Sequence, residues 1–170
     1  MIEVRWILVA SVGVAALTVA GPCAAEDPGA PWPRVGGHVG AVLPLFTADS
    51  SGSHAIGNFV TIAIASGVTV KLSDAVAVDF ENVVGEPLKP KGGTTGITID
   101  PGIIYDLGPV ALGLRVAYDV GQPPNLGLIP LVHKGFAVGP AAWFVEADFP
   151  VADRDGDASF TAAIHTGVSF

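Results

Sequence analysis

Acidic and basic side chains recur inside otherwise apolar segments, at spacings that place them on one side of an extended chain. Asp79 and Glu81 are two residues apart, and so are Glu146 and Asp148. Residues two apart on a β-strand point to the same face. Eight charged or titratable residues at such positions are Lys71, Asp79, Glu81, Asp100, Arg115, Glu146, Asp148 and His165. Brought together away from bulk water, these groups could conduct protons or ions, or neutralise one another as ion pairs.

A second group of chemically capable residues occupies one polar segment. It contains Asp49, Ser50, Ser51, Ser53 and His54. A Ser-His-Asp triad needs a defined geometry that neighbouring residues on a flexible loop rarely provide. The His-x-Ser arrangement of barrel deacylases is also missing, because Thr-Gly follows His165 and Lys-Gly follows His133. We therefore predict a solvated loop and no catalytic residue.

The acidic segment at Asp153, Asp155 and Asp157 raises the question of a calcium site. A calcium-binding EF-hand loop needs Gly at its sixth position and Glu at its twelfth. Here Gly156 is fourth and Ile164 is twelfth, which predicts an acidic hairpin tip. No phosphate loop, zinc spacing or dinucleotide fingerprint occurs either, so we expect no metal site and no cofactor.

Alternating residue patterns predict eight β-strands that must position these groups. The expected strands are 35–46, 59–72, 76–83, 96–106, 110–119, 127–138, 141–150 and 159–170. Tight turns at 73–74, 107–108 and 139–140 alternate with longer, more polar links. Short turns on one side and longer loops on the other are typical of an up-and-down membrane barrel.

The two faces of the expected strands differ in a way that favours an inside-out protein. Leu112, Leu114 and Val116 share one face of their strand, and Arg115 lies on the other. A cationic side chain facing lipid at mid-bilayer costs about 2–4 kcal/mol, so the charged face belongs in the lumen. The strand 35–46 alternates poorly, with His38 a candidate for the lumen. His133 and Lys134 fall on opposite faces, so one of them must point outward.

Six aromatic residues fall near the ends of the outward faces, where they would form two interfacial girdles. They are Tyr105, Trp143 and Phe170 on the short-turn side and Tyr118, Phe149 and Phe160 on the long-loop side.

Turn lengths also predict strand register. A two-residue loop at Leu107-Gly108 would place Asp100 directly opposite Arg115. Two-residue loops at Asp155-Gly156 and Gly139-Pro140 would place Glu146 opposite both His165 and His133.

Composition supports a membrane β-barrel with an N-terminal targeting segment. Half of the 170 residues are hydrophobic, 14% are charged, and 22 are Gly. Arg5, an apolar stretch and the small residues Cys23 and Ala25 predict a signal peptide over 1–25, cleaved before Glu26. A Pro-rich lead-in over 26–34 would precede the barrel domain, 35–170. The mature chain then has no Cys. It keeps a net charge of −8, from 7 Lys+Arg against 15 Asp+Glu, and this acidity argues against binding to nucleic acid.

The last strand carries a resemblance to a known family. Phe160, Ala162, Ile164, Thr166, Val168 and the terminal Phe170 share its apolar face. With the strand count and loop asymmetry, this resembles the small OmpA/OmpX-like eight-stranded outer-membrane barrels over about residues 35–170. The resemblance implies a monomeric, all-β, antiparallel barrel with a polar, plugged interior in the outer membrane of a Gram-negative bacterium. Its implied partners are lipid, lipopolysaccharide and the barrel-assembly machinery, which would recognise the C-terminal strand.

Three functions remain open from the sequence. The favoured one is a non-enzymatic outer-membrane barrel with a structural, surface-interaction or limited transport role, whose lumen charges form an ion-pair network. The alternatives are a lipid-modifying outer-membrane enzyme and a secreted, lipocalin-like barrel that binds an apolar ligand.

Overall fold

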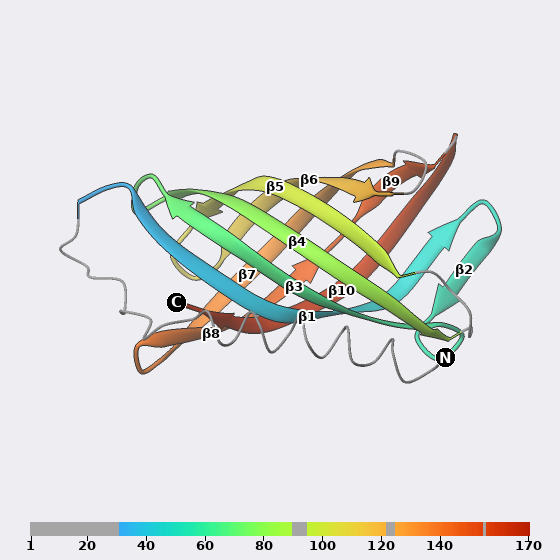
Figure 1. Cartoon of the computed structure of the whole chain (residues 1–170), viewed down its shortest axis with the longest axis horizontal. Coiled ribbons are helices and arrows are strands. Elements are labelled where there is room, and N and C mark those ends of the chain that lie inside the picture. Colours follow the sequence, from blue (N-terminus) through green and yellow to red (C-terminus); the bar gives the residue numbers. More distant parts are fainter. Residues whose placement is uncertain (1–30, 90–94, 122–124, 155) are drawn as a thin grey trace.

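The computed structural model describes residues 31–89, 95–121, 125–154 and 156–170. They form one antiparallel β-sheet that closes into a barrel, because its first and last spanning strands pair with each other (Figure 1). The strand order is β2-β1-β3-β4-β5-β6-β7-β8-β10-β9, and β1 also pairs with β10. The strands are β1 (Arg34–Asp49), β2 (Gly52–Ala55), β3 (Val60–Lys71), β4 (Val76–Lys89), β5 (Gly96–Asp106), β6 (Ala111–Val120), β7 (Leu126–Val138), β8 (Ala141–Asp148), β9 (Val151–Arg154) and β10 (Asp157–Ser169).

Eight of these ten strands form the closed barrel, which confirms the predicted all-β fold class. The two short strands are extensions at the long-loop end. β2 folds back on the end of β1, with Asp49 opposite Gly52. β9 continues β8 beyond Phe149 and Pro150 and pairs with the start of β10. Backbone hydrogen bonds from Phe149 N to Pro130 O (3.0 Å) and from Thr161 N to Pro150 O (2.8 Å) keep this continuation in the wall.

The two ends of the barrel differ as the loop lengths predict. Residues 72–75, 107–110 and 139–140 make the short turns. β1 begins at this same end, because Arg34 pairs with Lys71, and the C-terminus also lies there (Figure 1). Among the described residues there is no helix of the length and hydropathy needed to span a bilayer. The predicted signal peptide, 1–25, lies outside the described residues, as does most of the predicted lead-in, 26–34.

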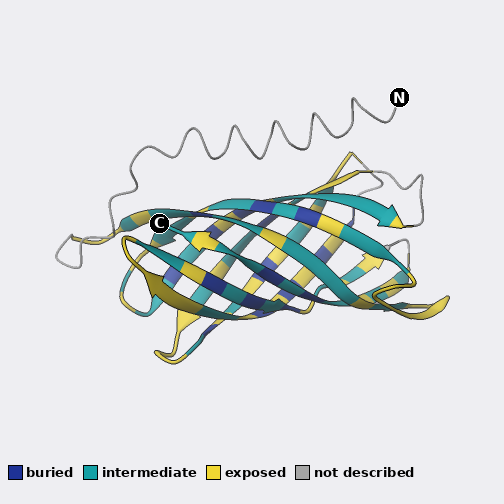
Figure 2. Cartoon of the chain, turned by 90° about the horizontal axis from the view of Figure 1, so that it is seen from below, coloured by how far each residue is buried: buried dark blue, intermediate teal, exposed yellow. Residues whose placement is uncertain are grey.

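Bulky apolar side chains lie on the outer surface, and most of the buried side chains inside are small or charged. Leu112, Leu114 and Val116 are 46%, 44% and 40% exposed, whereas Arg115 between them is 4% exposed. Figure 2 shows buried positions along the middle of the strands, interspersed with exposed and half-buried ones. A conventional soluble domain buries its large apolar residues, so this barrel is inside-out, as the sequence predicts.

A β-bulge explains why the first strand alternates poorly. Pro44 pairs with Ala163, but Phe46 pairs with Ala162, so Leu45 is an extra residue in β1. Before Leu45, even-numbered residues such as His38 face the lumen. After it, Phe46 points outward and lies beside Phe160, with ring centroids 6.4 Å apart.

The register predictions hold at two interfaces and fail at a third. Glu146 pairs with both His165 and His133. Asp155, part of one predicted turn, lies outside the described residues. The predicted Asp100–Arg115 pair is wrong, because Arg115 pairs with Gly102 and Asp106 pairs with Ala111. The turn therefore spans four residues, 107–110. Pro109 has no N–H for a ladder bond to Asp106, and the turn is closed by Leu107 N donating to Val110 O (2.9 Å).

Candidate functional site

Arg115, in the middle of β6, lies at the centre of a buried ion-pair network inside the barrel. Its Nη2 and Nε atoms are 2.9 and 3.1 Å from Asp79 Oδ2, and its Nη1 is 2.6 Å from Glu146 Oε1 and 3.5 Å from Glu81 Oε1. We call Arg115, Asp79, Glu81 and Glu146 the Arg115 cluster. Each of the three carboxylate residues is at most 2% exposed. One guanidinium thus joins strands on opposite sides of the lumen.

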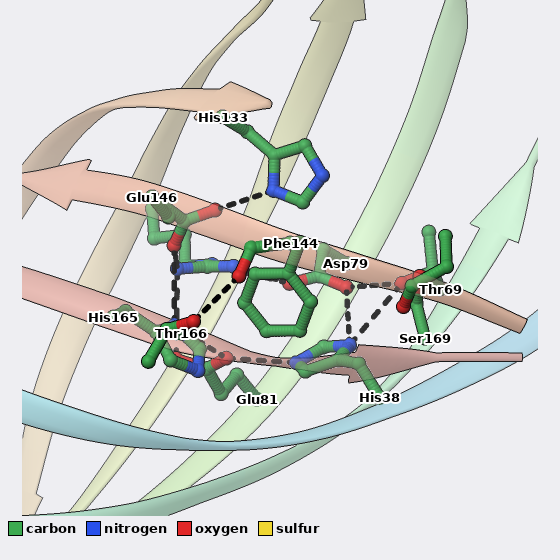
Figure 3. A network of polar contacts seen from close by, with 12 residues as sticks. His38, Thr69, Asp79, Glu81, His133, Phe144, Glu146, His165, Thr166 and Ser169 are labelled. Carbon is green, nitrogen blue, oxygen red and sulfur yellow. Dashed lines mark hydrogen bonds and ion pairs between the residues drawn. The ribbon is translucent and has the colours of Figure 1, made fainter. Parts of the chain in front are cut away.

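Three histidines surround this cluster and contact its carboxylates (Figure 3). His38 Nε2 is 2.7 Å from Glu81 Oε2. His133 Nδ1 is 3.1 Å from Glu146 Oε2. His165 Nδ1 is 3.4 Å from Glu146 Oε1 and 3.7 Å from Glu81 Oε2. The histidines therefore extend the polar network around the circumference of the lumen.

Phe144 is the one large aromatic ring among the fully buried side chains of the described chain, and it packs between the imidazoles. Its ring centroid is 4.9 Å from that of His165, edge to face, and 5.3 Å from that of His133, nearly parallel. His38 lies 6.1 Å away, also edge to face. An apolar ring in this position excludes water from one side of the cluster and strengthens the nearby electrostatic interactions.

Glycines on the lumen face leave room for the histidines. A β-carbon on Gly40 would lie 2.6 Å from His165 Nε2, and one on Gly67 would lie 2.6 Å from Nε2 of His38. Gly67 pairs with His38 across β1 and β3. Both contacts are closer than a real β-carbon allows, so these two positions require glycine for the imidazoles to lie where they do.

The Arg115 cluster lies between two cavities in the lumen. The first, about 460 Å³, opens at the short-turn end and is lined by residues including His38, Asp79 and Glu146. The second, about 660 Å³, opens at the long-loop end, and its lining includes Asp100 and Asp148. We call them the short-turn cavity and the long-loop cavity. Among the described lining residues, Arg115 alone belongs to both.

The structure brings most of the predicted lumen residues together. Asp79, Glu81, Arg115 and Glu146 form the cluster, and His165 contacts it directly. Asp100, opposite Glu81 on β5, and Asp148 are also buried but face the long-loop cavity. Lys71 is different, because it is exposed at the end of β3 and lines the mouth of the short-turn cavity.

Two groups of buried side chains have donor atoms close enough together to hold a metal ion. They are His38, Asp79 and Glu81, and Glu146, Asp148 and His165; within each group the donor atoms lie within 4.8 Å of one another. Arg115 already donates hydrogen bonds to Asp79 and to Glu146, one member of each group. The guanidinium therefore supplies the positive charge that a metal ion would otherwise bring.

The predicted girdle residues lie at both ends of the outer surface. Tyr105, Tyr118, Trp143, Phe149 and Phe160 are between 37% and 52% exposed. The sixth, Phe170, is half-buried because its ring packs against the outward side of Gly37. Phe136 stacks on Trp143 with ring centroids 5.1 Å apart, and Trp143 Nε1 donates to Thr166 Oγ1 (2.9 Å).

The Ser- and His-containing loop does not assemble a triad. Ser53 and His54 are adjacent on β2 and both exposed, so their side chains leave opposite faces of the strand. Asp49 accepts hydrogen bonds from the hydroxyl and the backbone N–H of Ser51, and the hydroxyl bond lowers the pKa of Asp49. Ser50 Oγ instead donates to Asp157 Oδ2 (2.9 Å), which links the tips of two hairpins.

The comparisons with known proteins agree with this architecture. No family model and no curated protein matches the chain. Among solved structures, the Neisserial surface protein A is similar at 17% identity and a TM-score of 0.53, covering 80% of this chain and 97% of that one. The chain has the fold of a small eight-stranded outer-membrane β-barrel.

Two further solved structures match at lower TM-scores. One is Ail, the attachment invasion locus protein of Yersinia pestis, in complex with the heparin analogue sucrose octasulfate, at 12% identity and a TM-score of 0.47, covering 80% of this chain and 97% of that one. The other is a designed transmembrane β-barrel, at 12% identity and a TM-score of 0.43, covering 84% of this chain and 98% of that one.

Three parts of the site were missing from the predicted network or only suggested by the sequence. His38 was obscured by the bulge in β1, which interrupts the alternation that identifies lumen residues. Phe144 is an apolar residue at the same strand parity as Glu146 and Asp148, so alternation places it in the lumen but does not explain why an apolar ring is there. His133 points into the lumen, where it contacts Glu146, while the Nζ atom of Lys134 donates to the backbone oxygen of Pro109 at the edge of the short-turn cavity.

Proposed function

We propose that the chain is an integral outer-membrane β-barrel protein whose polar lumen is blocked at mid-height by the Arg115 cluster. Its role would be structural or surface-interacting, with at most limited transport. The observation that carries this proposal is the inverted distribution of side chains: the barrel presents exposed Leu, Ile, Val and aromatic residues all round and buries its charges. Such a surface requires an apolar surrounding.

The arrangement of the lumen supports a blocked rather than an open interior. An eight-stranded barrel is only wide enough for its own side chains to fill. Here Arg115 extends between carboxylates of β4 and β8, and it is the one described residue that lines both cavities. The route between the two ends therefore passes through its guanidinium.

The test is planar-bilayer recording of refolded protein. We expect little or no current from the wild type and clear openings from Arg115→Ala, because the substitution removes the side chain that separates the cavities. Lys71→Ala, at the mouth of the short-turn cavity, is the matched control and should behave as the wild type. A wild type that already conducts steadily would contradict the blocked lumen.

Cell fractionation tests the location separately. We expect the protein in the outer-membrane fraction, resistant to extraction by carbonate and released by detergent. Recovery in the soluble periplasm would support the alternative of a secreted, lipocalin-like barrel. That alternative needs an apolar interior, and the buried Asp79, Glu146 and His165 argue against it.

A lipid-modifying activity is the weaker alternative because Ser53 and His54 face different sides of β2. Analysis of lipid A by mass spectrometry, with wild type and His54→Ala, would detect such an activity. We expect identical lipid profiles.

Assembly would follow from the last strand. Its apolar face ends on Phe170, whose backbone N–H donates to Gly37 O (2.9 Å) and whose backbone O accepts from Gly37 N (2.7 Å). This supports recognition of the C-terminal strand by the barrel-assembly machinery and insertion as a monomer among lipid and lipopolysaccharide.

A further inference from the structure

The long-loop cavity contains buried oxygen atoms that accept no hydrogen bond from the described protein groups. They are Oδ1 of Asp100, Oδ1 of Asn125 and Oδ1 of Asp148. The three residues are 2%, 7% and 5% exposed, and all three line this cavity. Buried polar atoms are normally paired, so these positions point to a partner that enters the cavity.

The unpaired atoms are all acceptors, which sets the chemistry of that partner. Asn125 donates through Nδ2 to Asp119 Oδ2 (3.0 Å). Because an ionised carboxylate only accepts, this bond orients the amide and leaves its oxygen free. A partner for the three atoms must therefore bring hydrogen-bond donors or positive charge.

The charge of the cavity favours a cation over a neutral donor. Asp100 and Asp148 line it and form no ion pair within 4.0 Å with a described residue, and Arg115 is the one cationic residue among the described lining residues. Arg115 already forms ion pairs with Asp79 (Nη2 to Oδ2, 2.9 Å) and Glu146 (Nη1 to Oε1, 2.6 Å), both of which line the other cavity. Asp100 and Asp148 therefore lack a cationic partner of their own, and a bound cation would supply one.

The spread of the acceptors distinguishes between kinds of cation. A calcium or magnesium ion needs oxygen ligands that converge at 2.0–2.6 Å. Among the described residues, Asp148 belongs to a group of three His, Cys, Asp or Glu side chains with donor atoms within 4.8 Å of one another, together with Glu146 and His165, whereas Asp100 belongs to none. An extended cation with several N–H donors fits separated acceptors better than a single metal ion does.

We propose that the long-loop cavity binds a small organic cation of the polyamine class, with two or more ammonium groups on a short alkyl chain. The ammonium groups would donate to Asp100, Asp148 and Asn125, and the alkyl chain would contact apolar lining residues such as Val42 and Ile129. The volume of about 660 Å³ lies in the usual range for small-molecule sites. This binding site is independent of whether the lumen conducts.

The test is isothermal titration of spermidine into the refolded protein in a zwitterionic detergent. We expect saturable binding by the wild type and affinity weaker by about tenfold or more in Asp100→Asn and Asp148→Asn, each of which removes one charge-assisted hydrogen bond. Asp74→Asn, an exposed charge at the opposite end of the barrel, is the matched control for general attraction to an acidic protein. It should bind as the wild type does.

A second variant keeps the test informative if either Asn variant fails to fold. Ala117 lines the same cavity and lies beside Asp100 on β6, between the paired positions Ile99–Tyr118 and Gly102–Arg115. Ala117→Lys would place a resident ammonium group next to Asp100 and should abolish spermidine binding. The proposal is overturned if the wild type shows no saturable binding, if Asp74→Asn weakens binding as much as Asp100→Asn, or if magnesium chloride binds with the same dependence on Asp100 and spermidine does not.

Discussion

Arg115 forms ion pairs with three carboxylates at the centre of the lumen, those of Asp79, Glu81 and Glu146. Its planar guanidinium offers five N–H donors, enough to bind Asp79 through two nitrogen atoms and Glu146 through a third. A lysine would bring a single ammonium group and could not match this fork. The surrounding carboxylates are almost completely buried, so the network depends on this one side chain.

Replacing Arg115 should therefore cost far more than an exposed cation would. We expect Arg115→Ala to lower the free energy of unfolding by about 3–5 kcal/mol, because Asp79 and Glu146 would be left buried without their cation. Urea titration of the protein in lipid vesicles, followed by tryptophan fluorescence, measures the change.

Lys71→Ala is the control for this measurement, since exposed charges typically contribute about 0–1 kcal/mol. Equal losses in Arg115→Ala and Lys71→Ala would contradict the dependence of the network on Arg115. The triple variant Asp79→Asn, Arg115→Met, Glu146→Gln should recover part of the loss, because it removes the charges together.

The sequence predicts which side chains face the lumen wherever alternation is regular, because a charged residue facing lipid is costly. That rule identified Asp79, Glu81, Asp100, Glu146, Asp148 and His165 as inward-facing. It could not give distances between residues on strands that are not neighbours. The approach of Arg115 to Asp79, two strands away, depends on barrel closure and on side-chain rotamers that no local pattern contains.

The bulge in β1 changes the face of every residue after Leu45. Pro44 faces the lumen, and Phe46 faces outward, with Leu45 as the extra residue between them. Removing Leu45 would leave Phe46 at the outward position that follows Pro44 in a regular strand. The pairing of β1 with β10 would then continue without interruption.

We therefore expect deletion of Leu45 to be tolerated, at the cost of the hydrogen bond that Leu45 O accepts from Ile56 N. Deletion of Val116 from β6, which has no bulge, should prevent folding because it turns one half of the strand inside out. Refolding yield, read from the shift in gel mobility between folded and heated samples, compares the two deletions. A yield as low for the Leu45 deletion as for the Val116 deletion would show that the extra residue in β1 is required, and a high yield for both would contradict the strict register of β6.

Strand register was predictable where the turn was short and no Pro stood at the first position of the next strand. Gly139-Pro140 is a two-residue connection, and it sets Glu146 opposite His133. The register after β5 was predicted wrongly, because Leu107-Gly108 resembles a two-residue turn. Pro109 has no N–H to donate to the ladder. The ladder resumes at Ala111, two residues later than predicted, which moves Arg115 opposite Gly102.

The molecule as a whole has an exterior that suits lipid, and this makes a depth-dependent prediction. Leu114, near the middle of β6, and Leu126, at the long-loop end of β7, both point outward and are 44% and 63% exposed. We expect Leu114→Arg to destabilise the protein in vesicles by about 2–4 kcal/mol and Leu126→Arg by about 0–1 kcal/mol. Urea unfolding of vesicle-inserted protein measures both.

A barrel surrounded by water would show no such dependence of stability on depth. There, an exposed arginine at either position would change stability by about 0.5 kcal/mol or less. Equal, small effects in the two variants would therefore contradict membrane insertion, whatever the lumen does.

The ring closes where β1 meets β10, with His38 opposite Ser169. The other neighbours in the ring follow one another along the chain. This junction joins the two ends of the domain, so it has the largest contact order and the greatest loop-closure entropy of any pairing in the wall. Until β10 joins the sheet, β1 and β8 carry unpaired backbone edges that favour aggregation. These edges therefore need protection for as long as the ring is open.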